Sequence, residues 1–193
     1  MNYEIHITLE ASNIDEFKKD CLEIGVKPII IETQNANNKI GIQVMTSSKH
    51  SGYHYLFTLN ELCGKLLEKN YNILRKKVEI QPEEEKHVEH IYYESHLRLK
   101  LPKDFEYNIL YELCEEHNFH LSKNLFKKDE NFIWQMITYR SKDTFDWFIW
   151  CIEIMKSNLK MAKIIFDKIE IEECIFDTNE GIDKSWLNEK ETD

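Results

Sequence analysis

The alternation of apolar and polar residues along the chain predicts eight strands and four helices. In the first stretch, Ile5, Ile7 and Leu9 share one face of a strand, and the polar residues between them share the other. Apolar residues at helical spacing follow, with Ser12 or Asn13 as the helix cap and Gly25 as its end. The first eighty residues therefore predict strands over 3–10, 28–31, 39–46 and 72–80 and helices over 14–24 and 52–67.

The same order recurs about ninety residues later. Tyr-Glu-x-His-x-x-Leu begins at Tyr3 and again at Tyr93, so the two histidines are 96 − 6 = 90 residues apart. Gln-x-x-Thr and Lys-x-Glu-Ile recur at offsets of 92 and 91, and such a fixed period indicates a duplication. The second copy predicts strands over 92–101, 120–127, 132–139 and 161–176 and helices over 105–117 and 145–159.

Each copy reads as β-α-β-β-α-β, the order of the ferredoxin-like module. The predicted fold is therefore α+β: a tandem duplication of this module, with two antiparallel sheets and the helices of each on one face. The predicted boundaries are a first lobe over 1–80, a charged linker over 81–91, a second lobe over 92–176 and a C-terminal tail over 177–193. A turn is expected at 35–38, and Trp186-Leu187 is expected to pack back on the domain.

Composition narrows the functional classes. A net charge of −10 argues against general binding of nucleic acid or anionic membranes, which needs clustered Lys and Arg. The five cysteines are odd in number and contain no C-x-x-C pair, which predicts buried, reduced thiols. We find no signal-peptide pattern at the N-terminus and no apolar run that approaches the ~18 residues of a membrane span. A cytoplasmic protein is expected.

The face of each sheet away from the helices is expected to carry the functional residues. The same residue types recur on it in both copies, which predicts a polar cleft for a small anionic or nucleotide ligand if the two faces meet. The plain alternative is a solvated sheet face. The predicted residues are Glu4, His6, Thr8, Gln43, Arg75, Lys77 and Glu79 in the first copy, and Glu94, His96, Arg98, Lys100, Gln135, Lys168 and Glu170 in the second.

The stretch His6-Ile7-Thr8-Leu9 resembles the H-x-[S/T]-apolar signature of the 2H phosphoesterases, a family that is also duplicated and bilobal. The resemblance implies that His6 and His96 act as general base and acid on a phosphodiester and that Thr8 holds the phosphate. In the second copy Arg98 replaces the hydroxyl, and an arginine can bind phosphate bidentately. No cofactor is expected for this chemistry.

Two alternatives remain open at this point. His6, Glu79, His96 and Glu170 would suit a divalent transition metal. A non-catalytic module could instead bind an anionic ligand or a protein through the positive side chains of Arg75, Lys77, Arg98, Lys100 and Lys168. The complete pattern, with two Glu-x-His motifs and Met45-Thr46-Ser47-Ser48, also resembles a family of duplicated ferredoxin-like proteins with no assigned activity.

Overall fold

The computed structural model describes residues 1–34, 40–82, 90–124 and 129–183. The predicted turn at 35–38, residues 83–89 of the predicted linker and Trp186-Leu187 lie outside these ranges. The predicted order of strands and helices is confirmed. The elements are β1 (Asn2–Glu10), α1 (Ile14–Ile24), β2 (Lys27–Gln34), β3 (Ile40–Ser51), α2 (Tyr55–Glu68), β4 (Asn72–Ile80), β5 (Tyr92–Pro102), α3 (Asn108–Glu116), β6 (His120–Asn124), β7 (Phe132–Ser141), α4 (Phe145–Met161), β8 (Ile165–Asp177) and a 3-10 turn (Glu180–Asp183).

The prediction of two separate ferredoxin-like sheets is wrong. The eight strands form one closed antiparallel barrel in the order β1-β3-β2-β6-β7-β5-β8-β4. The physical reason lies in strands that a module alone would leave at an edge: β2 pairs with β6, and β4 pairs with β8. Closure leaves no row of unpaired backbone N–H and C=O groups, so it removes the edges that two open sheets would expose.

The chain divides into two compact units whose boundaries fall inside strands. The first unit comprises Met1–Ile30, Gln43–Ile91 and Glu173–Glu180, and the second comprises Ile31–Ile42, Tyr92–Glu172 and Gly181–Asp193. The last part of β8 therefore belongs to the first unit, and the last part of β2 belongs to the second.

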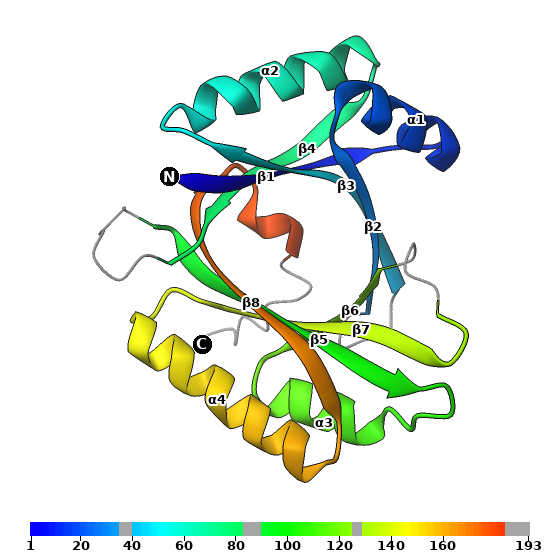
Figure 1. Ribbon diagram of the computed structural model, residues 1–193, viewed down its shortest axis with the longest axis vertical. Coiled ribbons are helices and arrows are strands. Elements are labelled where there is room, and N and C mark those ends of the chain that lie inside the picture. Colours follow the sequence, from blue (N-terminus) through cyan, green and yellow to red (C-terminus); the bar gives the residue numbers. More distant parts are fainter. Residues whose placement is uncertain (35–39, 83–89, 125–128, 184–193) are drawn as a thin grey trace, which may run out of the picture. The chain divides into compact units, whose positions relative to one another are not determined.

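In the first unit, α1 and α2 lie on the same side of β1, β3 and β4 (Figure 1). The apolar alternation of β1 faces these helices, and Ile5 and Ile7 are fully buried together with Phe17 of α1. Asn13 caps α1 by accepting hydrogen bonds from two backbone N–H groups of its first turn. Gly25 ends the helix with φ of 84°, a left-handed conformation that glycine adopts without steric cost.

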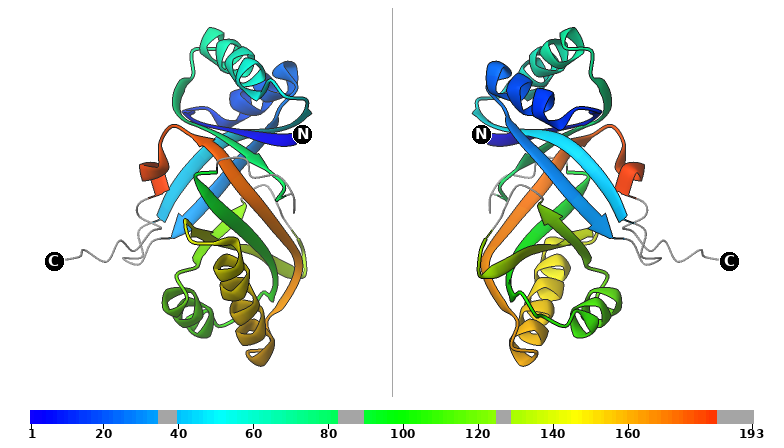
Figure 2. Two further views of the ribbon diagram at one scale, coloured as in Figure 1. Left: turned by 90° about the vertical axis from the view of Figure 1, so that its left-hand side faces the viewer. Right: turned by 90° about the vertical axis from the view of Figure 1, so that its right-hand side faces the viewer.

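In the second unit, α3 and α4 lie on one face of β5 and β7 (Figures 1 and 2). A hydrogen bond of 2.7 Å between His117, which ends α3, and Asn158 of α4 joins the two helices. Phe148 of α4 is fully buried and stacks on Tyr139 of β7, with ring centroids 5.7 Å apart. Apolar burial of this kind supplies the main stabilising contribution of such a layer.

The five cysteines are free thiols, and all but Cys151 are buried, as the sequence predicted. Within the described ranges, no helix has both the length and the apolar character needed to cross a membrane.

Candidate functional site

The middle of the first unit carries a group of polar side chains around His6. Glu4, His6 and Thr8 alternate with the buried apolar residues of β1 and so lie on the face away from the helices. Strand pairing places Ser47 of β3 and Lys77 of β4 on either side of His6. We call Glu4, His6, Ser47, Lys49, Lys77 and Glu79 the first histidine cluster.

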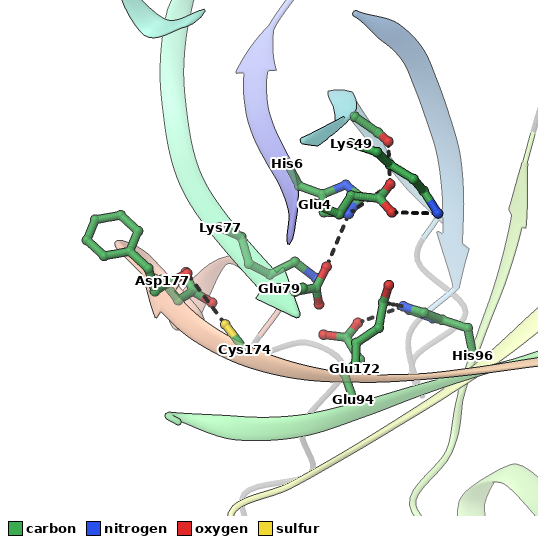
Figure 3. A network of polar contacts seen from close by, with 12 residues as sticks. Glu4, His6, Lys49, Lys77, Glu79, Glu94, His96, Glu172, Cys174 and Asp177 are labelled. Carbon is green, nitrogen blue, oxygen red and sulfur yellow. Dashed lines mark hydrogen bonds and ion pairs between the residues drawn. The ribbon is translucent and has the colours of Figure 1, made fainter. Parts of the chain in front are cut away.

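The two ring nitrogens of His6 have different surroundings (Figure 3). Nε2 lies 3.1 Å from Glu79 Oε2 and 3.5 Å from Glu4 Oε1. Ionised carboxylates can only accept hydrogen bonds, so the tautomer with the proton on Nε2 suits these two neighbours. Nδ1 is buried and has no hydrogen-bond partner among the described residues. In the neutral ring, Nδ1 therefore presents its lone pair.

The two carboxylates of the cluster are themselves held by cations and a hydroxyl. Glu79 is only 1 % exposed, and Lys77 Nζ lies 2.7 Å from its Oε1. Ser47 Oγ donates a hydrogen bond to Glu4, and Lys49 Nζ lies 3.2 Å from the same carboxyl. Burial alone would raise the pKa of Glu4, but the charge of His6 and the hydrogen bonds from Ser47 and Lys49 lower it overall.

The lowered pKa of Glu4 predicts an acid-sensitive contribution to stability. A carboxyl whose pKa falls on folding stabilises the protein above its ordinary pKa of 4.5, and this contribution is lost as the pH falls through the lower folded value. We expect Glu4→Gln to flatten the decline of unfolding free energy below pH 4.5, measured by urea unfolding at several pH values. Glu10→Gln, an exposed position at the end of the same strand, is the control. Parallel curves for wild type and Glu4→Gln would contradict this prediction.

The second unit has a related arrangement around His96, and we call Glu94, His96, Thr138, Arg140 and Glu172 the second histidine cluster. His96 Nε2 lies 3.3 Å from Glu94 Oε1 and 3.7 Å from Glu172 Oε2 (Figure 3). His96 Nδ1 lies 2.9 Å from Thr138 Oγ1. Arg140 binds the Glu94 carboxylate bidentately, at 2.8 and 3.1 Å.

The arginines expected to hold phosphate are both bound to aspartates. Arg75 pairs bidentately with Asp177, at 2.9 and 2.5 Å, and both side chains are buried. Arg98 pairs bidentately with Asp167, at 2.8 and 2.7 Å, on a partly exposed part of β5. Thr8 is buried on the His6 face. The positive charge beside His6 thus comes from Lys77 and Lys49 rather than from Arg75.

Three further predicted residues, Gln135, Lys168 and Glu170, also lie outside both histidine clusters. Gln135 lies opposite Leu99, on the face that the helices cover, and donates to the Tyr107 hydroxyl. Lys168 and Glu170 form an ion pair with each other on β8, and Glu172 is the residue of this strand that lies beside His96. Gln43 is on the His6 face of β3, four residues from Ser47.

Sequence reasoning did not assign five residues of the two clusters: Ser47, Lys49, Thr138, Arg140 and Glu172. The main cause is strand length. β3 continues to Ser51 and β7 to Ser141, beyond the predicted ends at 46 and 139. Residues 46–51 contain no apolar residue, so hydrophobic alternation gave no signal that this strand continues past Thr46.

The polar residues of this face are not an ordinary solvated sheet surface. Arg75, Lys77, Glu79 and Glu94 are all buried, with at most 7 % of each residue exposed. Buried charges are retained in proteins when they are paired, and each of these four residues has an oppositely charged partner: Asp177 for Arg75, Lys77 for Glu79 and Arg140 for Glu94. In the part of the chain that the structure describes, no group of three or more His, Cys, Asp or Glu residues is placed to hold a metal ion.

No model of a known protein family matches the chain, and no curated protein matches it. Similar solved structures include the small subunit of acetolactate synthase from Thermotoga maritima, with 9 % identity, 92 % of this chain and 96 % of that chain covered, and a TM-score of 0.32. A heme-binding protein from Thermus thermophilus has 12 % identity, 90 % coverage of both chains and a TM-score of 0.31. An unknown protein from Galdieria sulphuraria has 12 % identity, 89 % coverage of this chain and 97 % of that chain, and a TM-score of 0.28.

Proposed function

We propose that this protein is an acid–base enzyme acting on phosphoesters, with His6 as the group that exchanges a proton with the substrate. The observation that carries the proposal is the arrangement of the His6 ring: Nε2 is held by Glu79 and Glu4, and the buried Nδ1 has no hydrogen-bond partner among the described residues. A carboxylate that fixes one ring nitrogen sets the tautomer and leaves the other nitrogen to accept a proton.

The choice of a phosphoester rests on the His6-Ile7-Thr8-Leu9 motif and on nearby charge. Thr8 lies two residues from His6 on the same strand face and supplies a hydroxyl. Lys77 and Lys49 bring two ammonium groups to the carboxylates around His6. A phosphate group approaching His6 would share these ammonium groups with Glu79 and Glu4. The joint action of His6 and His96 on one phosphodiester stays a prediction.

The experiment that tests the proposal is hydrolysis of bis(4-nitrophenyl) phosphate, followed by the absorbance of released nitrophenolate. Nitrophenolate is a stable anion and leaves without being protonated, so the reaction needs no general acid. The rate therefore reports on the general base alone. We expect His6→Ala to lower the rate by about 10²–10⁴-fold, the usual contribution of a positioned base. The acid limb of the pH–rate profile should disappear in the same variant.

His50→Ala is the matched control, because His50 lies on β3 beside Tyr3 rather than with His6. Its rate should equal that of the wild type. A His6→Ala variant that keeps the wild-type rate, or a wild-type protein no faster than buffer, would refute the proposal.

A second candidate is anion binding without turnover, favoured by the two lysines beside His6. It predicts that inorganic phosphate raises the melting temperature of the wild type and not that of Lys77→Met, with no hydrolysis by either protein. Stabilisation of both proteins to the same extent would argue against this site.

A further inference from the structure

The two histidine clusters are built from the same kinds of groups at matched strand positions. Each histidine follows a glutamate in a Glu-x-His motif, and its Nε2 faces two carboxylates. Each also has a hydroxyl residue as its cross-strand partner: Ser47 for His6 and Thr138 for His96. A lysine, Lys49, or an arginine, Arg140, lies opposite the glutamate of the motif.

The clusters differ in where the hydroxyl points. In the second cluster, Thr138 Oγ1 is 2.9 Å from His96 Nδ1, and the hydroxyl donates to this nitrogen in the neutral ring. In the first cluster, Ser47 Oγ donates to Glu4, and His6 Nδ1 has no hydrogen-bond partner in the described ranges. A buried polar atom left in this way destabilises the fold, because it has lost its hydrogen bond to water without gaining another. The first cluster therefore loses stability at His6 Nδ1 that the second cluster keeps through the bond between Thr138 and His96.

The basic residue opposite each glutamate explains this difference. The side chain of Arg140 is only 9 % exposed and binds both oxygens of Glu94 through its planar fork, so Glu94 does not take the Thr138 hydroxyl. Lys49 is a point charge on a largely exposed side chain, and it contacts Glu4 through one oxygen. The other Glu4 oxygen accepts from Ser47, which turns that hydroxyl away from His6.

We propose that the two histidine clusters have different roles, and that Lys49 and Arg140 determine which histidine is open, that is, has an Nδ1 without a hydrogen bond. His6 presents a bare Nδ1 as a base, whereas His96 is closed at both nitrogens and joins β5 to β7. The substrate role of His6 rests on the proposed function, but the open and closed states of the two rings do not. Lys49 is thus a positioning residue that acts on His6 through Glu4 and Ser47.

The test is long-range ¹H–¹⁵N NMR of the histidine rings, recorded on the full chain without substrate. In the wild type, His6 Nδ1 should resonate as a bare nitrogen and His96 Nδ1 as a hydrogen-bonded one. Thr138→Val should move only His96 Nδ1 to the bare position. Lys49→Arg should move only His6 Nδ1 to the hydrogen-bonded position, because Glu4 then releases the Ser47 hydroxyl.

Ser47→Ala combined with Lys49→Arg is the matched control and should return His6 Nδ1 to the bare position. Thr138→Ser keeps the hydroxyl and should leave His96 Nδ1 at the hydrogen-bonded position. It thereby shows that the change in Thr138→Val comes from loss of the hydroxyl and not from loss of folding. Equal Nδ1 frequencies for the two rings, or a Lys49→Arg spectrum identical to that of the wild type, would overturn the inference. Failure of the phosphoester assay would leave these spectra unchanged, so the two proposals can fail separately.

Discussion

Replacement of Asp177 by alanine is expected to lower the free energy of unfolding by about 3–5 kcal/mol, because it removes the bidentate carboxylate from a buried guanidinium. The side chain of Arg75 is 4 % exposed and that of Asp177 is fully buried, so solvent replaces little of the lost interaction. Asp177 also accepts from the Asn179 backbone N–H, and the Asn179 side chain donates to the Leu74 carbonyl of β4. Urea unfolding followed by circular dichroism measures the change.

Asp167→Ala is the matched control, since Asp167 binds Arg98 with the same bidentate geometry at a partly exposed position. Exposed ion pairs contribute only ~0.2–1 kcal/mol, so this variant should remain close to the wild type. Equal losses in the two variants would show that burial does not determine the energy of the Arg75–Asp177 pair. Phe148→Ala, which removes a fully buried ring, serves as a reference and should lower the free energy of unfolding by about 3–5 kcal/mol.

Glu94→Ala is expected to produce a loss of the same order, about 3–5 kcal/mol, because Arg140 and His96 both depend on this carboxylate. Glu94 is buried, and the side chain of Arg140 is only 9 % exposed. Arg140 also lies over the Tyr92 ring at 5.2 Å, where it stays confined after the substitution. Thermal and urea unfolding of the variant should show the loss at neutral pH.

Glu4→Ala provides the comparison from the first copy. The lysine that Glu4 binds, Lys49, has 74 % of its side chain exposed and regains water when the carboxylate is removed. We therefore expect a smaller loss than for Glu94→Ala, although the two glutamates occupy equivalent positions of the duplicated motif. A larger loss for Glu4→Ala would contradict the division between an open and a closed cluster.

Local features of the fold could be predicted from the sequence, and the pairing of strands could not. The cap at Asn13, the end of α1 at Gly25 and the alternation of Ile5 and Ile7 depend on residues close in the chain. The pairing of β2 with β6 and of β4 with β8 joins residues that are far apart in the chain, from 122 − 33 = 89 to 177 − 77 = 100 residues. Hydrophobic alternation is satisfied equally by two open sheets and by one closed barrel, so it could not choose between them.

The histidines and their Glu-x-His motifs were also predictable, but the register of the second copy was not. The sequence match aligned Gln43 with Gln135 at an offset of 92, whereas the structure matches Ser47 to Thr138, at 138 − 47 = 91. A slip of one residue moves a side chain to the other face of a strand, which is why Gln135 lies among the helix-facing residues. On β8, Glu172 rather than Glu170 lies beside His96.

Residues 173–177 belong to the first unit, although they follow the second unit's strands in the sequence, and this limits which fragments of the chain can fold by themselves. A fragment that ends at Ile91 would contain β1 to β4 but would lack the segment that pairs with β4. It would also lack the Asp177 carboxylate that neutralises Arg75. The first copy of the duplication is therefore not a self-sufficient piece, because the strand segment that pairs with β4 lies in the second copy of the sequence.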